Sequence, residues 1–162
     1  TQGVSSAASD VYKRQGMLAA GRKRHKDIKF QQGDALNLPF AENRFDVTTI
    51  SFGLRNTSDT TAALKDALRV TKKGGRIVVC EFSHPTNKVF RFIYLKYLMR
   101  ALPVIAKRIS KNPAAYIYLA ESIQAWPNQS SLAQVMRQAG WETVSWQDLT
   151  FGIVAVHIGY KG

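Results

Sequence analysis

Polar residues follow three apolar, strand-like runs of this 162-residue chain, and their types could hold a small molecule. Asp34 follows the first run; its carboxylate can accept a hydrogen bond from an adenine amino group, and Ala35 beside it lets a ring lie close. Ser51 ends the second run and offers a hydroxyl. Arg55 is a planar cation that suits a carboxylate, a polarised carbonyl or an ordered water, and Asn56 follows it. These residues predict a small-molecule site.

Each of these residues also has a structural interpretation. Asp34 could be a solvated loop residue, Ser51 part of a strand-end turn, and Asn56 a helix cap. A lone histidine such as His84, which follows the third run, is more often structural than catalytic. Residue type alone therefore does not separate a site from ordinary loop chemistry.

The composition limits the kinds of partner and bound group that the chain can have. The formal charge is +12, from 23 basic and 11 acidic residues, which favours an anionic partner: nucleic acid, a membrane surface or an anionic cofactor. The single cysteine, Cys80, excludes an internal disulfide, and the three histidines lack metal-ligand spacing, so no metal is predicted. No stretch reaches the roughly 18 uncharged apolar residues of a transmembrane helix.

The pattern in the first half predicts alternating helices and strands. Helices are expected over 16–26 and 58–71, and strands over 28–32, 45–51 and 76–82, the last as a central strand buried on both faces. The turn KKGG should stop the second helix through a left-handed glycine. Such alternation implies a parallel sheet with helical crossovers, whose carboxyl edge binds ligands. All three polar stretches should open on that edge.

The second half is different in character. Residues 87–111 form a long basic and aromatic segment without an acidic residue, expected to be helical with a break near Pro103. Helices over 112–126 and 128–140 and an antiparallel pair of strands over 141–149 and 152–161 complete the expected elements.

The basic segment has two interpretations. Lys96, Arg100 and Lys107 fall on one side of a helix, while apolar side chains crowd the rest, as in a helix that lies at a membrane interface. A buried helix with snorkelling lysines would have the same composition. On the next helix Tyr116, Tyr118 and Glu121 share or adjoin one helical face near this segment; packing accounts for the tyrosines, but Glu121 is harder to explain as core.

Several longer stretches resemble one family. They are ISFGLRN, VTKKGG, RIVVCEFSHP, YIYLAESIQAWPNQSSLAQVMRQAGW and LTFGIVAVHIGYKG. Together they resemble the class I S-adenosylmethionine-dependent methyltransferases, and more narrowly the C-methyltransferases of menaquinone and ubiquinone biosynthesis. The resemblance runs from about Gly16 to Gly162. It implies a Rossmann-like α/β fold, mostly parallel, with an antiparallel carboxyl-terminal strand pair.

The family pattern begins with parts that are not found in this sequence. These are a strand with a glycine-rich loop and a strand ending in an acidic residue, which hold the methionine part and ribose of S-adenosyl-L-methionine. We therefore expect residues 16–162 to be a partial methyltransferase domain lacking the first strands, behind a disordered or foreign leader over 1–15. Weak or no cofactor binding by this chain would follow, and the activity of the fragment is in doubt.

The resemblance also implies residue roles. Asp34 and Ala35 match the adenine-side pair, and Ser51 matches a cofactor-contacting residue. Arg55 matches an arginine that helps to remove a ring proton through water. Asn56, Tyr116 and Glu121 are assigned to the substrate.

The implied reaction is methylation of a ring carbon of a prenylated demethylquinol. The enzyme has to align methyl group and ring and exclude water, and a base then restores aromaticity. The segments GMLAAGRKRH and NPAAYIYLAESI resemble the menaquinone branch more than the ubiquinone branch.

We expect a cytoplasmic protein that associates peripherally with the inner face of the membrane. A homodimer is allowed for, and nucleic acid is not expected as a partner. The alternative is a non-catalytic basic module that binds nucleic acid or acidic lipid, which salt-sensitive binding would reveal.

Overall fold

The computed structural model describes residues 31–109 and 113–162, together with residues 16, 18–20 and 23. It divides into two compact units, Thr1–Asp34 and Ala35–Gly162, which are treated separately.

In the first unit, the described residues within 16–26 are helical, as expected. Residues 31 and 32 are not in a strand, so that end of the strand expected over 28–32 is wrong. The rest of that strand and the leader over 1–15 lie outside the described residues.

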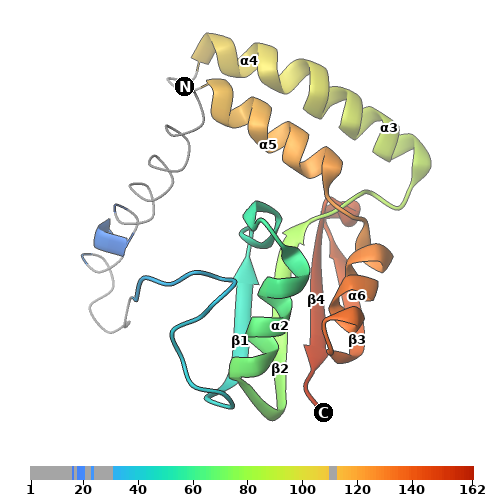
Figure 1. The fold of residues 1–162 in the computed structure, drawn as a ribbon. Coiled ribbons are helices and arrows are strands. Elements are labelled where there is room, and N and C mark those ends of the chain that lie inside the picture. Colours follow the sequence, from blue (N-terminus) through green and yellow to red (C-terminus); the bar gives the residue numbers. More distant parts are fainter. Residues whose placement is uncertain (1–15, 17, 21–22, 24–30, 110–112) are drawn as a thin grey trace. The chain divides into compact units, whose positions relative to one another are not determined.

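The second unit is built on a mixed sheet of four strands (Figure 1). Its members are β1 (Phe45–Ser51), β2 (Thr71–Phe82), β3 (Glu142–Leu149) and β4 (Val154–Tyr160), in the order β1-β2-β4-β3. β1 and β2 are parallel, whereas β4 is antiparallel to both β2 and β3. The antiparallel carboxyl-terminal pair is confirmed. Among the described strands, the parallel part of the expected sheet is the β1–β2 pair.

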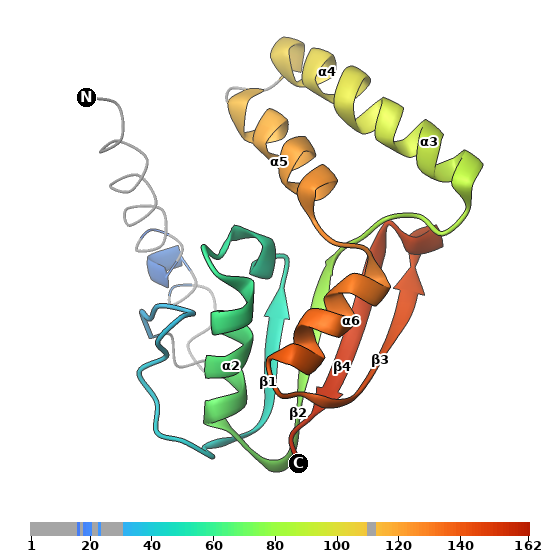
Figure 2. The same cartoon turned by 45° about the vertical axis from the view of Figure 1, so that its right-hand side comes forward.

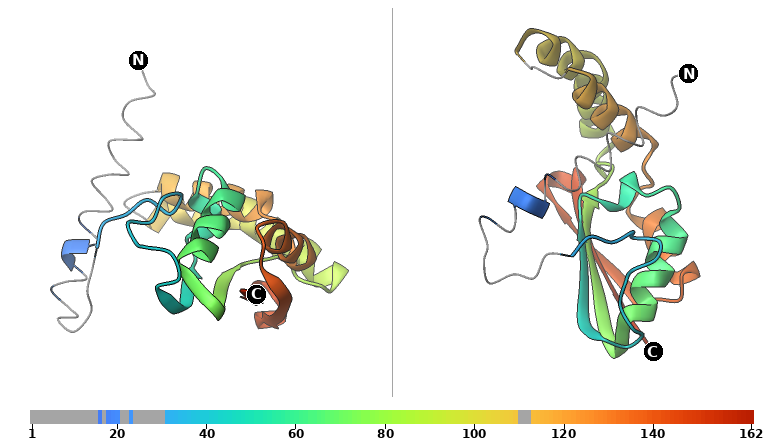
Figure 3. Two further views of the ribbon diagram at one scale, coloured as in Figure 1. Left: turned by 60° about the horizontal axis from the view of Figure 1, so that its bottom comes forward. Right: turned by 60° about the vertical axis from the view of Figure 1, so that its left-hand side comes forward.

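Helices α2 (Thr60–Val70) and α6 (Gln129–Gln138) cover one face of this sheet (Figure 3). Each begins at a side-chain cap. Asp59 accepts the Ala62 backbone N–H at 2.9 Å, and Asn128 accepts that of Ser131 at 3.0 Å. Such caps satisfy donors that the first helical turn leaves free.

The core lies between these two helices and the sheet. On β2, Ile77 and Val79 are fully buried and pack with Leu64, Met136 and Trp141. Residues of the opposite parity on β2, from Val78 to Phe82, are half-buried. The expectation that β2 is buried on both faces is therefore wrong, because the helices of the described part cover one face.

The turn between α2 and β2 also differs from the expectation. Thr71 has extended backbone angles and ends the helix, four residues before the second glycine. Gly74 does adopt a positive φ of 73°, but it lies within β2, where its N–H bonds the carbonyl of Lys161 at 2.8 Å. The glycine thus shapes a bulged strand start instead of stopping the helix.

Three further helices follow the carboxyl end of β2: α3 (Lys88–Lys96), α4 (Leu102–Ile109) and α5 (Pro113–Ala125). A π-helical turn, η2 (Tyr97–Ala101), joins α3 to α4, and the Leu102 N–H bonds the Tyr97 carbonyl. The helix continues through Pro103, which has no backbone N–H, so in place of the break expected near this residue there is a π-helical turn just before it. Figure 2 shows α3 and α4 as one arm beside α5.

A small apolar cluster holds this helical arm. It consists of Leu98, Ala120 and Ile123, with Phe82 at the end of β2 packed against them. Within the described residues, no helix is both long and apolar enough to cross a bilayer.

Candidate functional site

The loop after β1 places Arg55. Phe52 follows the strand with a positive φ of 51°, which is unusual for a bulky residue. Its N–H still bonds the carbonyl of Cys80 on β2 at 2.9 Å. The chain then forms a short 3-10 helix, η1 (Leu54–Asn56), which the fully buried Leu54 anchors in the core. Because both sides of Arg55 are held in this way, its backbone position is defined by the β1–β2 pair.

The guanidinium of Arg55 forms a buried ion pair with Glu81. Arg55 Nη1 lies 2.7 Å from Glu81 Oε1, and the two side chains are 9% and 1% exposed. The same Nη1 donates to the Phe52 carbonyl at 2.9 Å. The guanidinium carbon lies 5.0 Å from the centre of the Phe82 ring, a cation–π contact. The arginine is thus a constrained group at the carboxyl edge of the sheet.

The residue that sequence reasoning missed is Glu81. It is an acidic residue near the end of the largely apolar run RIVVCEF, and this unusual position could have marked it as a functional residue. Among the described residues, the Arg55 Nε atom is buried without a hydrogen-bond partner. An unsatisfied buried donor costs about 1–3 kcal/mol unless a ligand or water completes it, so this edge of Arg55 is a candidate contact for a bound molecule.

Asn56 connects the same loop to α5. The Tyr118 hydroxyl donates to Asn56 Oδ1 at 3.0 Å. Within the described residues, no hydrogen bond joins Tyr116 or Glu121 to Arg55 or Asn56. Their assignment to the substrate stays a prediction, while Tyr118 is the tyrosine that the structure brings to the loop.

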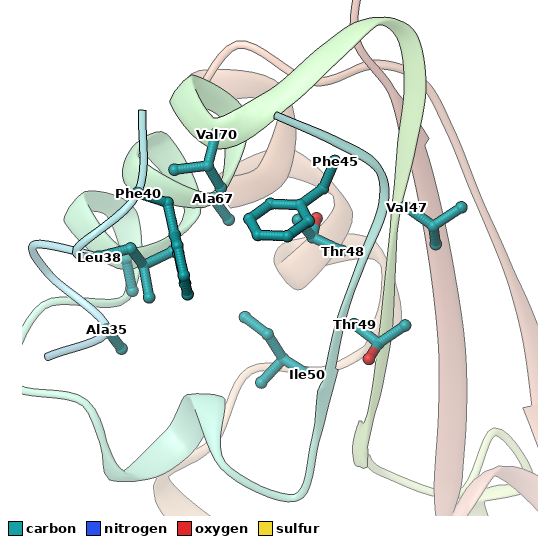
Figure 4. A pocket seen from close by; sticks show the side chains of 11 residues that line it. Ala35, Leu38, Phe40, Phe45, Val47, Thr48, Thr49, Ile50, Ala67 and Val70 are labelled. Carbon is teal, nitrogen blue, oxygen red and sulfur yellow. The ribbon is translucent and has the colours of Figure 1, made fainter. Parts of the chain in front are cut away.

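Ala35 lines a pocket of about 270 Å³ between the chain before β1, the strand itself and α2 (Figure 4). Side chains of Leu38, Phe40, Phe45 and Ile50 surround it and make it mostly apolar. The remaining lining residues are Val47, Thr48, Thr49, Ala63, Ala67 and Val70. The assignment of Ala35 to the adenine side stays a prediction.

Ser51 and Asp34 belong to different units of the chain. Ser51 is exposed at the end of β1, is not among the residues that line the Ala35 pocket, and its hydroxyl makes no hydrogen bond within the described part of the chain. Asp34 is the last residue of the first unit. The expected convergence of Asp34, Ser51 and Arg55 therefore stays a prediction.

The remaining candidates are structural. Burial, with the Glu81 carboxylate next to it, raises the pKa of the Cys80 thiol, so the reactive thiolate is disfavoured. His84 Nε2 bonds the Trp126 carbonyl at 2.8 Å, and His157 Nε2 bonds that of Gln129 at 2.9 Å. Both histidines hold helix ends in place.

Solved structures with a similar fold include several methyltransferases. A SAM-dependent methyltransferase of Thermotoga maritima matches with a TM-score of 0.58 and 22% identity, over 88% of this chain and 68% of that protein. The CMeT domain of the citrinin polyketide synthase matches with a TM-score of 0.63 and 14% identity, over 90% of this chain and 36% of that one. The fold is that of the class I S-adenosylmethionine-dependent methyltransferases.

Sequence relatives define the family. Residues 8–161 match the model of the ubiE/COQ5 methyltransferase family, and the chain belongs to that family. The demethylmenaquinone methyltransferase of Mycobacterium marinum is 60% identical over 146 residues, 90% of this chain and 62% of the relative. That of Streptomyces avermitilis is 57% identical over 90% of this chain and 63% of its own length. The chain thus spans less than two thirds of these relatives.

Proposed function

We propose that the whole protein transfers a methyl group from S-adenosylmethionine to a ring carbon of a prenylated demethylmenaquinol. The supporting observation is that a chain 57% identical to a demethylmenaquinone methyltransferase carries a buried arginine at the carboxyl edge of its sheet. The similar relatives favour menaquinone over ubiquinone as the product, in agreement with the sequence prediction.

Two observations support the proposed cofactor side. Ala35 borders an apolar pocket of about 270 Å³, and Ser51 is exposed at the strand end, where its hydroxyl bonds none of the described residues. Asp34 is proposed to complete the adenine side. The cofactor supplies an electrophilic methyl group on its sulfonium.

Arg55 is proposed to act on the acceptor side. A quinol ring carbon is already nucleophilic, so the protein has to align the ring and exclude water. When the new C–C bond forms and the S–C bond breaks, the ring proton must leave. A guanidinium group carries only hydrogen-bond donors and cannot itself act as the base. Arg55 therefore orients an ordered water or a quinol oxygen through its remaining N–H groups, next to Asn56.

The test uses the whole protein with a short-chain demethylmenaquinol and labelled S-adenosylmethionine. Mass spectrometry should find one methyl group on the ring. Arg55→Ala should lower kcat by about 100-fold or more, whereas Arg76→Ala, which removes an exposed arginine of β2, should not. A wild-type protein without turnover would overturn the reaction, and full activity of Arg55→Ala would remove Arg55 from it.

We also propose that the protein is cytoplasmic and docks peripherally on an anionic membrane, through α3 and η3 (Thr150–Gly152). Apolar side chains are strongly exposed there: Phe151 81%, Val89 69%, Phe92 68% and Ile93 57%. Val89, Ile93 and Phe151 border a pocket of about 580 Å³. Lysines and arginines are interspersed among the apolar residues of α3, and no acidic residue occurs between Glu81 and Glu121. This composition suits an interfacial helix.

Flotation with vesicles tests this surface. Vesicles of phosphatidylcholine with phosphatidylglycerol should bind the protein, and phosphatidylcholine alone should bind it less. Phe92→Ser with Ile93→Ser should weaken binding, while Tyr160→Ser, at an exposed site on β4, should not. Binding to nucleic acid without vesicle binding would instead favour the basic-module alternative. Sedimentation of the protein without vesicles tests whether it forms the homodimer that the sequence analysis allows for.

A further inference from the structure

Glu81 is a buried carboxylate whose contacts converge on Arg55. Its Oε1 accepts from Arg55 Nη1 at 2.7 Å and from the Phe82 backbone N–H at 2.9 Å. Its Oε2 lies 3.4 Å from the backbone nitrogen of Arg55. One carboxylate thus contacts the side chain and the main chain of the same arginine.

This pair is not what core stability alone would select. Two residues of the same face of β2, Ile77 and Val79, are apolar and fully buried. Burying a charge pair costs desolvation, and apolar residues of similar volume often stabilise a protein equally well or better. Packing therefore does not explain why a charged residue occupies position 81, and a functional role does.

The geometry leaves one side of the guanidinium for a ligand. Nη1 is already committed to Glu81 and to the Phe52 carbonyl, and the Phe82 ring contacts the guanidinium plane. The donors that remain are Nε–H and the Nη2 group, and Nε is buried without a partner among the described residues. Fixing Nη1 fixes the direction of these donors, because the guanidinium is planar and rigid.

We propose that Glu81 is a positioning residue that fixes the Arg55 guanidinium so that its Nε and Nη2 donors face the acceptor molecule. The inference rests on the proposed function. It predicts that Glu81 acts entirely through Arg55. Glu81→Gln keeps the side-chain volume and removes the charge that holds Nη1.

A double-mutant cycle in the whole protein separates positioning from a structural role. Glu81→Gln should lower kcat by roughly tenfold or more, because small misplacements of a catalytic group are costly, and should leave the KM for S-adenosylmethionine unchanged. In the Arg55→Ala background, the same change should have no further effect. The exposed Glu142→Gln on β3 is the matched control. Unchanged kcat, or an equal loss without Arg55, would overturn the proposal.

A second readout does not need turnover. In nitrogen-15 spectra of the protein, the Arg55 guanidinium should show hindered rotation and slow hydrogen exchange, and Glu81→Gln should accelerate both. If wild-type protein does not methylate a quinol, the proposed function fails while this measurement still decides whether Glu81 holds Arg55. Equal exchange in wild type and variant would overturn the positioning role.

Discussion

The Tyr118 hydroxyl donates a 3.0 Å hydrogen bond to the side-chain oxygen of Asn56, across 62 residues of the chain. Tyr118 lies on α5 and Asn56 on η1, so this bond connects α5 to the loop that carries Arg55. The phenol is 56% exposed. An exposed hydrogen bond contributes little to stability. We therefore expect this bond to affect mainly the binding of the acceptor, by fixing the position of α5 relative to the Arg55 loop.

Tyr118→Phe tests this tie. The free energy of unfolding should fall by less than about 1 kcal/mol, because the bond competes with water. In the whole protein, KM for the quinol should rise more than KM for S-adenosylmethionine, measured by steady-state kinetics with each substrate varied. Tyr160→Phe on β4 is the control. A larger effect of Tyr116→Phe would instead support the tyrosine chosen from the sequence.

Trp141 should dominate the stability of the second unit. It is 1% exposed, and its Nε1 donates to the Leu64 carbonyl at 3.1 Å. Trp141→Ala should cost about 3–5 kcal/mol through the cavity that it leaves. Trp146→Ala, at a site 42% exposed, should cost far less. Urea unfolding of both variants checks the contrast, and similar midpoints would contradict the assigned core.

Replacing Gly140 or Gly74 by alanine should destabilise the protein to different degrees. Both have positive φ, 102° and 73°. A Cβ at Gly140 would lie 2.8 Å from Leu68 Cδ2, whereas one at Gly74 meets nothing within 4 Å. Gly74→Ala should cost about 1 kcal/mol from the left-handed backbone alone. Gly140→Ala should cost more, because its φ of 102° lies farther from the left-handed region that alanine can reach and the end of the Leu68 side chain has to shift; thermal unfolding of the two variants would contradict this if the order were reversed.

His157 should make stability depend on pH. Burial lowers its pKa below the ordinary 6.5, although its bond to the Gln129 carbonyl and the nearby Asp148 act in the opposite direction. As pH falls below 6.5, the unfolded chain takes up a proton that the folded chain excludes. The free energy of unfolding should therefore decrease, by at most about 1.4 kcal/mol per pH unit, until pH reaches the lower folded pKa.

Denaturant unfolding at several pH values checks this. His157→Gln should flatten the dependence just below pH 6.5, because glutamine can still donate to the Gln129 carbonyl but does not titrate. The lowered pKa values of Asp46 and Asp66 act below their ordinary 3.8, outside this window. An unchanged slope in the variant would assign the titration to another group.

Elements with local signals were predicted from the sequence. The helix over 128–140 carries its own start and stop: Asn128 caps the first turn, and Gly140 adopts the positive φ that ends it. Near Pro103 the expected break is a π-helical turn within a continuous helix. The alternating pattern of β4 likewise predicted a strand, and its burial has period two. On β3 only Val144 is buried, so its place in the sheet comes from its pairing with β4.

The site could be predicted only in part. Arg55 and Asn56 were recognised by type and by resemblance, but their partners were not. Ser51 pairs with Cys80 in the register of β1 and β2, so Glu81 lies one residue beyond the end of β1, where the chain turns back through η1. That register brings Glu81 to Arg55 across 26 residues. Tyr118 was passed over for the same reason, since the packing of α5 chooses between neighbouring tyrosines.

By itself the sequence determined the family, through the resemblance of its longer stretches. It also determined most of the order of helices and strands and the chemical groups at the strand ends, because these depend on residue type and short-range periodicity. The tertiary structure alone decided which face of β2 is buried, which acid pairs with Arg55 and which tyrosine reaches Asn56. Those outcomes depend on strand register and helix packing, which arise from contacts between residues far apart in the chain.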